Sequence, residues 1–449
     1  MLIHKQAKHY LYRVLNLFQF KRVVTILVSS SLLLFSAFVS ASTSCENDSI
    51  PQVLTKQIAL NRLLQCNLDI VDSKRFITAN EANLSIAGQT QNPNLTIGVG
   101  NINPKLGIGS GSYFDKTIDN SVRYEQLIER GNKRDLRIKS ALGQISAAKQ
   151  DVFDIERQQS IALLRAMVDL IAINERVILL SEVVALYDET LHANTIRTKK
   201  GDLPPIDEQR QKIDANHAQI ELRQAKSEEK SAQLTLATLL AWESKADALV
   251  VDPSILDIIP VENSNFDISN RADIKAAKLR VEAASNQLDL AQAQLKSDIT
   301  AGMQYDHWPT STNNPTGTGD TISFTIGLPL TINHRYEGEI ARANSDFEAA
   351  KESLAHIEAN AKIEWLRMNA DIASAETGLD ILQKEQLPRA EDVARTVELG
   401  YKKGALNLLD LLDARRMLRQ THLDTLNARA NLARATLIRN QSIAANNIN

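Results

Sequence analysis

Two aspartates at the start of a predicted helix are the side chains whose type and spacing best fit cation binding. Asp410 and Asp413 follow the tight turn Tyr-Lys-Lys-Gly at 401–404. Residues three apart share a helix face, and several copies of such a helix would present rings of carboxylates, which favour cations. Acids in a first turn are also common, because they interact favourably with the helix dipole. The pair is therefore either a cation-binding ring or an ordinary helix start.

Beyond residue 41, few other side chains are arranged for catalysis or for metal binding. The histidines there lack metal-ligand spacing, and no phosphate-binding glycine loop, G-x-S-x-G motif or cysteine cluster occurs. We interpret these histidines as surface residues: His192, His217, His307, His334, His356 and His422. The sequence predicts no enzymatic activity, no cofactor and no resident metal.

The first 41 residues predict an export signal. A basic, acid-free stretch precedes an apolar run from Val23 to Val39, and small residues offer a cleavage site after Ala41. An uncleaved membrane anchor is the alternative, although the run is short for a spanning helix. Without this leader, 46 Lys and Arg face 54 Asp and Glu, a net charge of −8. That balance argues against nucleic acid as a partner and suits a passage for cations.

Both cysteines follow the leader. In an oxidising compartment, a disulfide between Cys45 and Cys66 is the simplest interpretation, and it would tie down the N-terminal segment. The alternative is acylation of Cys45 as a lipoprotein, but the Ser-Thr-Ser sequence before it lacks the usual pattern.

The elements that would position these groups occur twice. Lys199–Gly201 is echoed by Lys402–Gly404 (404 − 201 = 203), and Asn94–Thr96 faces Asp298–Thr300 (298 − 94 = 204). A nearly constant offset indicates one structural unit present twice. We place repeat 1 at residues 42–250 and repeat 2 at 251–449. Each would contain a helix, a β-hairpin and a long helical hairpin.

Hydrophobic periodicity predicts the strands and helices of each repeat. Alternating apolar residues predict strands at 95–99, 117–127, 299–305 and 321–330. Proline-poor segments predict long helices at 135–198 and 337–400, with Pro388 as the site of a kink. Apolar steps of three and four at 138–155, and of seven at 206–241, are typical of coiled-coil seams.

The combination of strands and helices predicts a channel built between subunits. Four strands cannot close a barrel, and an open sheet edge cannot lie in lipid. Three copies would supply twelve strands, within the range of outer-membrane barrels. We therefore predict an α+β membrane protein: a trimeric β-barrel with four strands per subunit, continued by a long α-helical coiled-coil barrel. The helices alone would also fit an ordinary bundle.

Four segments resemble the TolC-like outer-membrane efflux proteins. Residues 125–134 (EQLIERGNKR) resemble the strand-to-helix junction of the heavy-metal, CzcC-like branch, with Gly-Asn where a glycine pair is usual. Residues 327–330 (GLPL) match the counterpart of that junction. Residues 270–277 resemble the family's Arg-Pro-Asp-Leu segment, with Ala272 in place of proline. Residues 401–414 resemble the second helical-hairpin turn, at the periplasmic tip.

The resemblance implies a periplasmic gate. In the family, aspartates at the positions of Asp410 and Asp413 narrow the pore mouth and select for cations. An aspartate at the position of Asp207 contacts the tyrosine that corresponds to Tyr401 and latches the closed end. Leu406 stands where an arginine usually strengthens this latch, so the latch is either weaker or built differently. The chain reversals fall at Gly201 and Gly404.

The resemblance also implies the function and partners. We expect the outer-membrane channel of a tripartite efflux system in a Gram-negative bacterium, with its helical barrel in the periplasm. Its partners would be two further copies, a periplasmic membrane fusion (adaptor) protein, an inner-membrane pump of the resistance-nodulation-division (RND) type and outer-membrane lipid. The expected cargo is a divalent cation such as cobalt, zinc, cadmium or copper. The alternatives are multidrug efflux, type I secretion and, in another class, a soluble periplasmic coiled-coil scaffold.

Overall fold

The computed structural model describes Cys45 and residues 49–102, 105, 107–110, 117–257, 267–309 and 319–444. The chain divides into two units, Met1–Ser49 and Ile50–Asn449, and the second holds every helix and strand named below. The predicted leader and parts of both strand-connecting loops lie outside the described residues. Among the helices of the described ranges, none combines the length and apolar character needed to cross a membrane.

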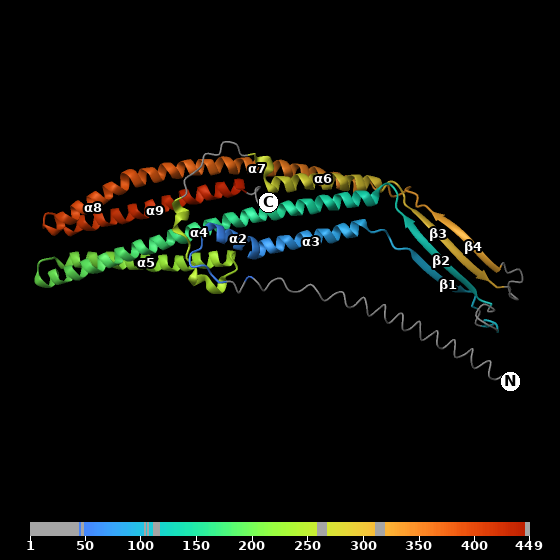
Figure 1. The fold of residues 1–449 in the computed structure, drawn as a ribbon, viewed down its shortest axis with the longest axis horizontal. Helices are drawn as coiled ribbons and strands as arrows, with labels where there is room; N and C mark the ends of the chain where they lie inside the picture. The colour runs from blue at the N-terminus through green and yellow to red at the C-terminus, as the bar shows by residue number, and fades with distance from the viewer. Residues whose placement is uncertain are drawn as a thin grey trace, which may run out of the picture. The chain divides into compact units, whose positions relative to one another are not determined.

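Four strands form one antiparallel sheet in the order β1-β2-β3-β4 (Figure 1). They are β1 (Asn94–Gly100), β2 (Asp119–Ile128), β3 (Ile299–Trp308) and β4 (Gly319–Gly327). The predicted strands are thus present, and β1 and β4 are the two edges. One face carries exposed apolar side chains from every strand: Leu95, Ile97, Val99, Val122, Tyr124, Ile128, Met303, Tyr305, Ile322, Phe324 and Ile326. We call this surface the apolar sheet face.

The two β-hairpins repeat one another residue by residue. Gly98 lies opposite Ser121 between β1 and β2, and Gly302 lies opposite Thr325 between β3 and β4. Both members of the pair shift by the same amount (302 − 98 = 204 and 325 − 121 = 204). In each place a Cβ on the glycine would collide with the hydroxyl oxygen across the strands. The two hairpins therefore correspond down to single side-chain contacts.

Proline decides where the long helices are interrupted. In repeat 1, α4 runs unbroken over Lys133–Lys200, 68 residues. In repeat 2, the matching segment divides into α7 (Glu337–Ile381), the π-helical turn η5 (Leu382–Gln386) and α8 (Leu387–Lys402). The π turn ends two residues before Pro388, which has no N–H to donate to the preceding turn. The expected kink site is thus a π-helical turn.

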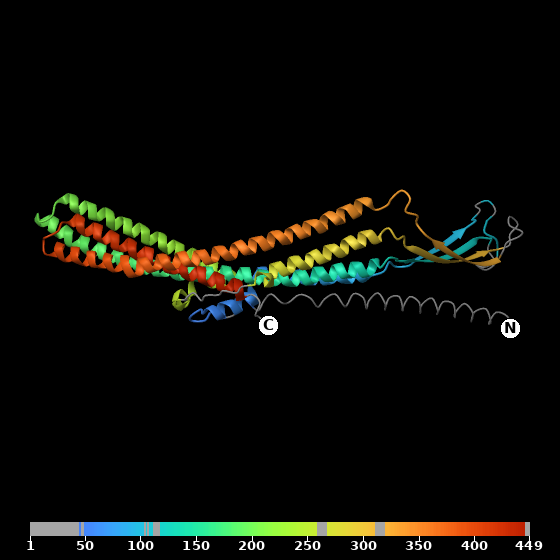
Figure 2. The same ribbon diagram turned by 90° about the horizontal axis from the view of Figure 1, so that it is seen from above.

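The other helices complete two helical hairpins and their supports. They are α2 (Lys56–Cys66), α3 (Leu68–Gly88), α5 (Pro205–Leu239), α6 (Ala272–Ala293) and α9 (Leu408–Ala444), with the short turns η2 (Glu243–Ala248), η3 (Pro253–Asp257) and η4 (Ile268–Asn270). Helices α4 and α5 form one hairpin, α8 and α9 form the other, and the two hairpins lie side by side (Figure 2).

The main hydrophobic core lies where α2, α4, α5 and α9 meet. Leu163 and Met167 of α4 are fully buried there, together with Leu240 after α5. Arg62 of α2 donates to the Leu240 carbonyl at 3.1 Å and lies over the ring of Trp242. This arginine satisfies a carbonyl at the end of α5, where the helix leaves it without a partner. A smaller core, which includes Leu411, fills the space between the two hairpin tips.

Two sequence patterns differ from their expected packing. The seam on α4 is buried at Ile145 and Val152, but the heptad stripe on α5 stays more than half exposed at Ile206, Ile213 and Ile220. A heptad pattern predicts that a helix has a partner, and here that partner is absent from the described part of the chain. Likewise, the strand predicted to reach residue 330 ends at Gly327.

Candidate functional site: the hairpin tips

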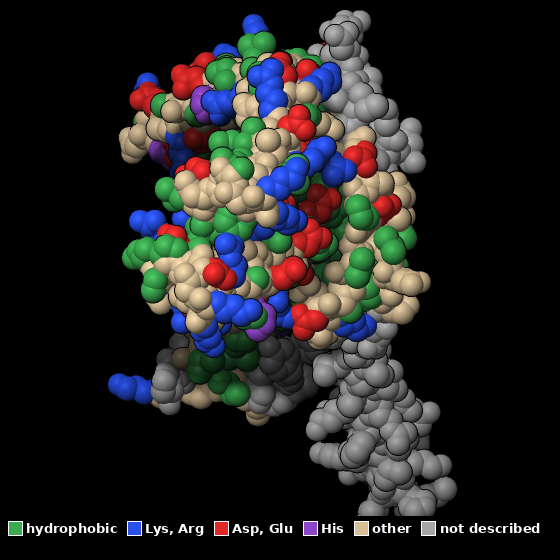
Figure 3. Space-filling view, turned by 90° about the vertical axis from the view of Figure 1, so that its left-hand side faces the viewer, with side chains coloured by type: hydrophobic (Ala, Val, Ile, Leu, Met, Phe, Trp, Pro, Cys, Tyr) green, Lys and Arg blue, Asp and Glu red, His purple; other side chains and the backbone are tan. Residues whose placement is uncertain are grey.

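Both helical hairpins turn back at glycines in the left-handed region. Gly201 ends α4 with a φ of 81°, and Gly404 follows α8 with a φ of 75°. Beyond the chain neighbours, no atom lies within 4 Å of a Cβ placed on either residue, so backbone conformation rather than space selects glycine. Both turns lie at one end of the helical hairpins, where acidic and basic side chains are interspersed (Figure 3).

Asp410 caps the start of α9. Its Oδ2 accepts the backbone N–H of Asn407 at 3.2 Å, and Oδ1 of Asn407 accepts the backbone N–H of Asp410 at 3.0 Å. This reciprocal arrangement is a capping box, which satisfies free N–H groups of a first helical turn. One of the two predicted gate acids therefore has the helix-start role that the sequence left open as an alternative.

Asp413 is exposed and shares an arginine with a buried acid. Its Oδ1 lies 3.3 Å from Nη1 of Arg416, and its side chain is 63% exposed. Nη2 of Arg416 donates to both carboxylate oxygens of Asp214 on α5, at 2.6 and 2.7 Å. The hydrogen bond to Asp214 raises the pKa of Arg416. Asp413 is thus the predicted gate acid that faces solvent, and Arg416 offsets part of its charge.

Tyr401 joins the two hairpins through different partners from those expected. Its hydroxyl accepts from Nη1 of Arg197 at 2.9 Å and donates to Oδ1 of Asn194 at 3.2 Å. Asn194 in turn donates to Gln211 at 2.8 Å, and both amides are buried. Asp207 instead lies 3.4 Å from Arg210, three residues along α5. Within one chain, the predicted Tyr401–Asp207 contact is therefore replaced by a tyrosine–arginine–asparagine cluster.

Two further arginines of α9 reach the first hairpin. Arg415 donates to Oγ1 of Thr190 on α4 at 2.9 Å, and Arg419 lies 3.5 Å from Glu221 on α5. Between them Tyr187 is buried, and burial raises the pKa of its phenol. The sequence analysis did not single out Arg415, Arg416 or Arg419. The seven-residue spacing of Asp214 and Glu221 on α5, which are partners of Arg416 and Arg419, was a signal that could have pointed to them.

The strand-to-helix junction of repeat 1 is also held by charge. Nζ of Lys133, at the start of α4, lies 2.9 Å from Asp298, and its side chain is only 4% exposed. Asp298 also accepts the backbone N–H of Arg130 at 2.9 Å. Glu129 and Arg137 form two parallel hydrogen bonds of 2.8 and 2.9 Å. The segment that resembles the CzcC-like junction therefore fastens β2 and α4 to the residue before β3.

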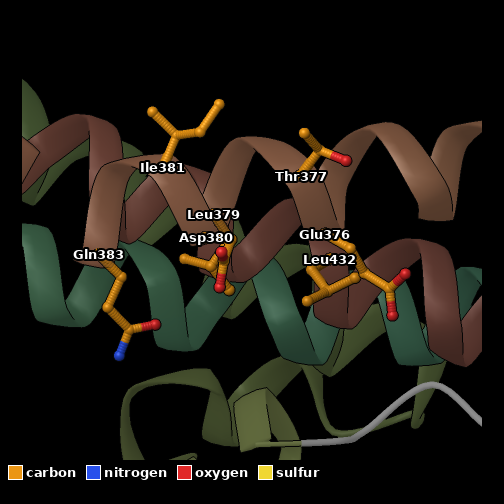
Figure 4. Close-up of a pocket in the computed structure, with 7 residues that line it drawn as sticks. All are labelled: Glu376, Thr377, Leu379, Asp380, Ile381, Gln383 and Leu432. Atoms are coloured by element: carbon orange, nitrogen blue, oxygen red, sulfur yellow. The ribbon is translucent and has the colours of Figure 1, made fainter. Parts of the chain in front are cut away.

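The described residues contain no group of three or more His, Cys, Asp or Glu that could hold a metal ion. A shallow groove of about 500 Å³ beside η5 is lined by Glu376, Thr377, Leu379, Asp380, Ile381, Gln383 and Leu432 (Figure 4). Its side chains come from α7, η5 and α9 and mostly point to solvent. Cys45 and Cys66 are both disulfide-bonded.

Comparison with known proteins identifies a similar family and structures of the same fold. Residues 267–437 match the family described as outer membrane efflux protein. The CusC channel has the same fold at a TM-score of 0.70 and 14% identity, covering 90% of this chain and 96% of that one. VceC from Vibrio cholerae gives a TM-score of 0.68 at 17% identity, covering 86% and 95%.

The chain thus resembles the outer membrane efflux protein family over residues 267–437 and shares the fold of CusC and VceC. It is similar to the cobalt-zinc-cadmium resistance protein CzcC of Cupriavidus metallidurans, with 21% identity over 300 residues. That match spans 66% of this chain and 70% of the relative.

Proposed function

We propose that three copies of this chain form the outer-membrane channel of a tripartite RND-type efflux system that exports divalent heavy-metal cations. The observation that carries the assembly is the pair of unmatched surfaces on each copy. The sheet has two free edges and an exposed apolar face, and α5 exposes a heptad stripe. Open sheet edges and contiguous exposed apolar faces are typical of surfaces that a partner covers.

A trimer would satisfy both surfaces at once. Pairing β4 of one copy with β1 of the next would close twelve strands into a barrel whose apolar face meets lipid. The α5 stripe would then pack against a neighbouring helix of the next copy, as coiled-coil seams do. Heating purified membranes before electrophoresis tests this. A heat-sensitive trimer in the outer membrane supports it, and recovery in the soluble periplasmic fraction would favour the scaffold alternative.

The cargo rests on the similarity to CzcC and on the net negative charge of the exported chain. Loss of the gene should increase sensitivity to cobalt, zinc, cadmium or copper, and the intact gene should restore tolerance. Drug sensitivity measured in the same strains is the matched control. Unchanged tolerance to all four metals, with increased drug sensitivity, would move the function to multidrug efflux.

The hairpin tips would be the periplasmic gate, and Asp413 its cation-selecting acid. In a trimer, Asp413 gives a ring of three carboxylates, which favours cations. We expect Asp413→Asn to lower cation selectivity in planar bilayers. We expect Asp410→Ala to destabilise the start of α9 by about 1 kcal/mol, because it removes a capping side chain. Asp392→Asn, an exposed acid on α8, is the control. Unaltered selectivity in Asp413→Asn would return that residue to an ordinary solvated acid.

In this proposal the channel is a passive conduit. The adaptor would dock at the hairpin tips, and the pump would select and energise the cargo upstream.

A further inference from the structure

The face of the sheet opposite the apolar sheet face carries charged side chains on its two central strands only. Successive side chains of a strand point to opposite faces, so the strand register assigns each residue to one face. The charged residues of this second face are Asp119, Arg123 and Glu125 on β2 and Asp306 on β3. The edge strands β1 and β4 supply only asparagine, glycine, serine and threonine there (Figure 1). We call this surface the polar sheet face.

Arg123 and Gln304 meet at the centre of the polar sheet face. The two residues are directly opposite in the pairing of β2 with β3, and Nε of Arg123 donates to Oε1 of Gln304 at 2.5 Å. Nε2 of Gln304 donates to Oδ1 of Asp306 at 2.7 Å. Nη1 of Arg123 lies 3.6 Å from Oε1 of Glu125. The guanidinium therefore lies between two carboxylates, one reached directly and one through the Gln304 amide.

Gln304 is the contact that fixes the position of Arg123. A side-chain amide accepts through its oxygen and donates through its nitrogen, so two unlike partners set its orientation. One of these partners, Asp306, is itself buried. The side chain of Arg123 is 46% exposed, and an exposed ion pair such as that with Glu125 contributes little by itself. Among the described residues, Arg123 makes no other hydrogen bond or ion pair. Without Gln304, its guanidinium would be free to turn away from the sheet.

The equivalent positions of the other repeat hold glycine. The shift of 204 between the hairpins relates Arg123 to Gly327 and Gln304 to Gly100 (327 − 123 = 204 and 304 − 100 = 204). Both glycines lie in paired strands, with Gly327 opposite Thr300 and Gly100 opposite Asp119. Strand pairing at this level therefore does not require the Arg123–Gln304 contact, and the contact needs another explanation.

In the proposed trimer, the polar sheet face would line the lumen of the barrel, because the apolar sheet face meets lipid. The Arg123 side chains of three copies would then lie at one height. Rings of arginine favour anions and oppose cations. A cation leaving through the barrel would meet this barrier unless each guanidinium stayed close to the wall, beside carboxylates that offset its charge.

We propose that Gln304 is a positioning residue for the passage of cations: it holds Arg123 against the barrel wall between Glu125 and Asp306. Two acids then offset one arginine in each copy, so the lumen stays negative at this height. A released guanidinium would extend into the lumen and repel cations. This inference rests on the proposed channel, and it adds a second selectivity-determining cluster, in the barrel rather than at the hairpin tips.

Recordings of the full-chain trimer in planar bilayers under a potassium chloride gradient test the proposal. The readout is the ratio of K⁺ to Cl⁻ permeability. Gln304→Ala should lower this ratio at least about three-fold, because the released guanidinium repels cations. Arg123→Gln should raise it, and the double variant should match Arg123→Gln alone, because Gln304 acts only through Arg123. Ser323→Ala, opposite Gln304 on β4, is the control and should leave the ratio unchanged.

The outcomes separate this inference from the proposed function. An unchanged ratio in Gln304→Ala trimers, or an equal fall when Arg123 is already glutamine, would overturn the positioning role and leave the channel intact. Gln304→Glu keeps an acceptor for Arg123 and should not lower the ratio. A fall in that variant would also overturn the role, and it decides the matter if Gln304→Ala does not assemble. A natural chain that forms no channel and is recovered as a soluble monomer would instead contradict the proposed function.

Discussion

The two strand-to-helix junctions share a backbone but differ in what holds them. Asn132 starts α4 with a φ of 57°, and Tyr336, at the equivalent position, starts α7 with a φ of 56°. In repeat 1 this junction is fastened by Lys133 to Asp298. In repeat 2 the equivalents of that pair are Glu337 and Asn94 (133 + 204 and 298 − 204), which cannot form a salt bridge.

The difference teaches how a duplicated unit divides its contacts. The backbone path recurs in both copies of the repeat, including a left-handed residue that only a few side chains adopt readily. The Lys133–Asp298 salt bridge lies where repeat 1 contacts repeat 2 of the same chain. The equivalent contact of repeat 2 faces outward, where its partner would be another copy.

The largest expected effect breaks the fastened junction. Lys133→Ala leaves Asp298 without its buried cation and should lower the free energy of unfolding by about 3 kcal/mol. Its matched control is Glu337→Ala at the equivalent, exposed position, which should change stability by less than about 0.5 kcal/mol. Thermal unfolding of detergent-purified protein at fixed concentration measures both. Equal losses would show that the junctions are held alike.

A second comparison concerns the arginines at the two hairpin tips. Nη2 of Arg416 donates to both carboxylate oxygens of the buried Asp214. Arg210 makes a single 3.4 Å contact with Asp207. We expect Arg416→Ala to cost about 2 kcal/mol, because hydrogen bonds to charged groups are strong when shielded from water. Arg210→Ala should cost at most about 0.5 kcal/mol, as exposed ion pairs do. Chemical denaturation of both variants decides. A larger loss in Arg210→Ala would contradict the assignment of the tie to Arg416.

The smallest effect should be the same in both repeats. Gly201→Ala and Gly404→Ala force a Cβ into a left-handed conformation and should each cost about 1 kcal/mol. Gly338→Ala, at an uncrowded helical position in α7, should instead be neutral or stabilising by up to about 1 kcal/mol. Melting temperatures of the three variants sharpen the comparison. A marked difference between Gly201 and Gly404 would mean that one turn carries contacts absent from a single chain.

Periodicity predicted the fold well because it reports directly on burial and backbone. The strands, the unbroken helix over 135–198 and the interruption near Pro388 all followed from alternation, spacing and a missing N–H. The two turns followed from glycine. These are local properties of the sequence, and both repeats show them.

The contacts at the tips were harder to predict because they join residues about two hundred positions apart. Tyr401 was expected to meet Asp207, but α4 presents Arg197 and Asn194 to its hydroxyl instead. The aspartate pair 410 and 413 looked uniform in sequence, yet one caps a helix and the other faces solvent. Which acid meets which base depends on the rotation of packed helices, which spacing along one helix does not specify.

The exposed stripe of Ile206, Ile213 and Ile220 has a consequence for how the protein is made. A single newly exported copy would show water both this stripe and the apolar sheet face, at roughly 25 cal/mol per Å² of unburied surface. Exposed apolar surface of this kind favours association between unassembled copies. The stability of the protein should therefore rise with protein concentration, so that production rate, as much as sequence, would decide the yield of folded channel.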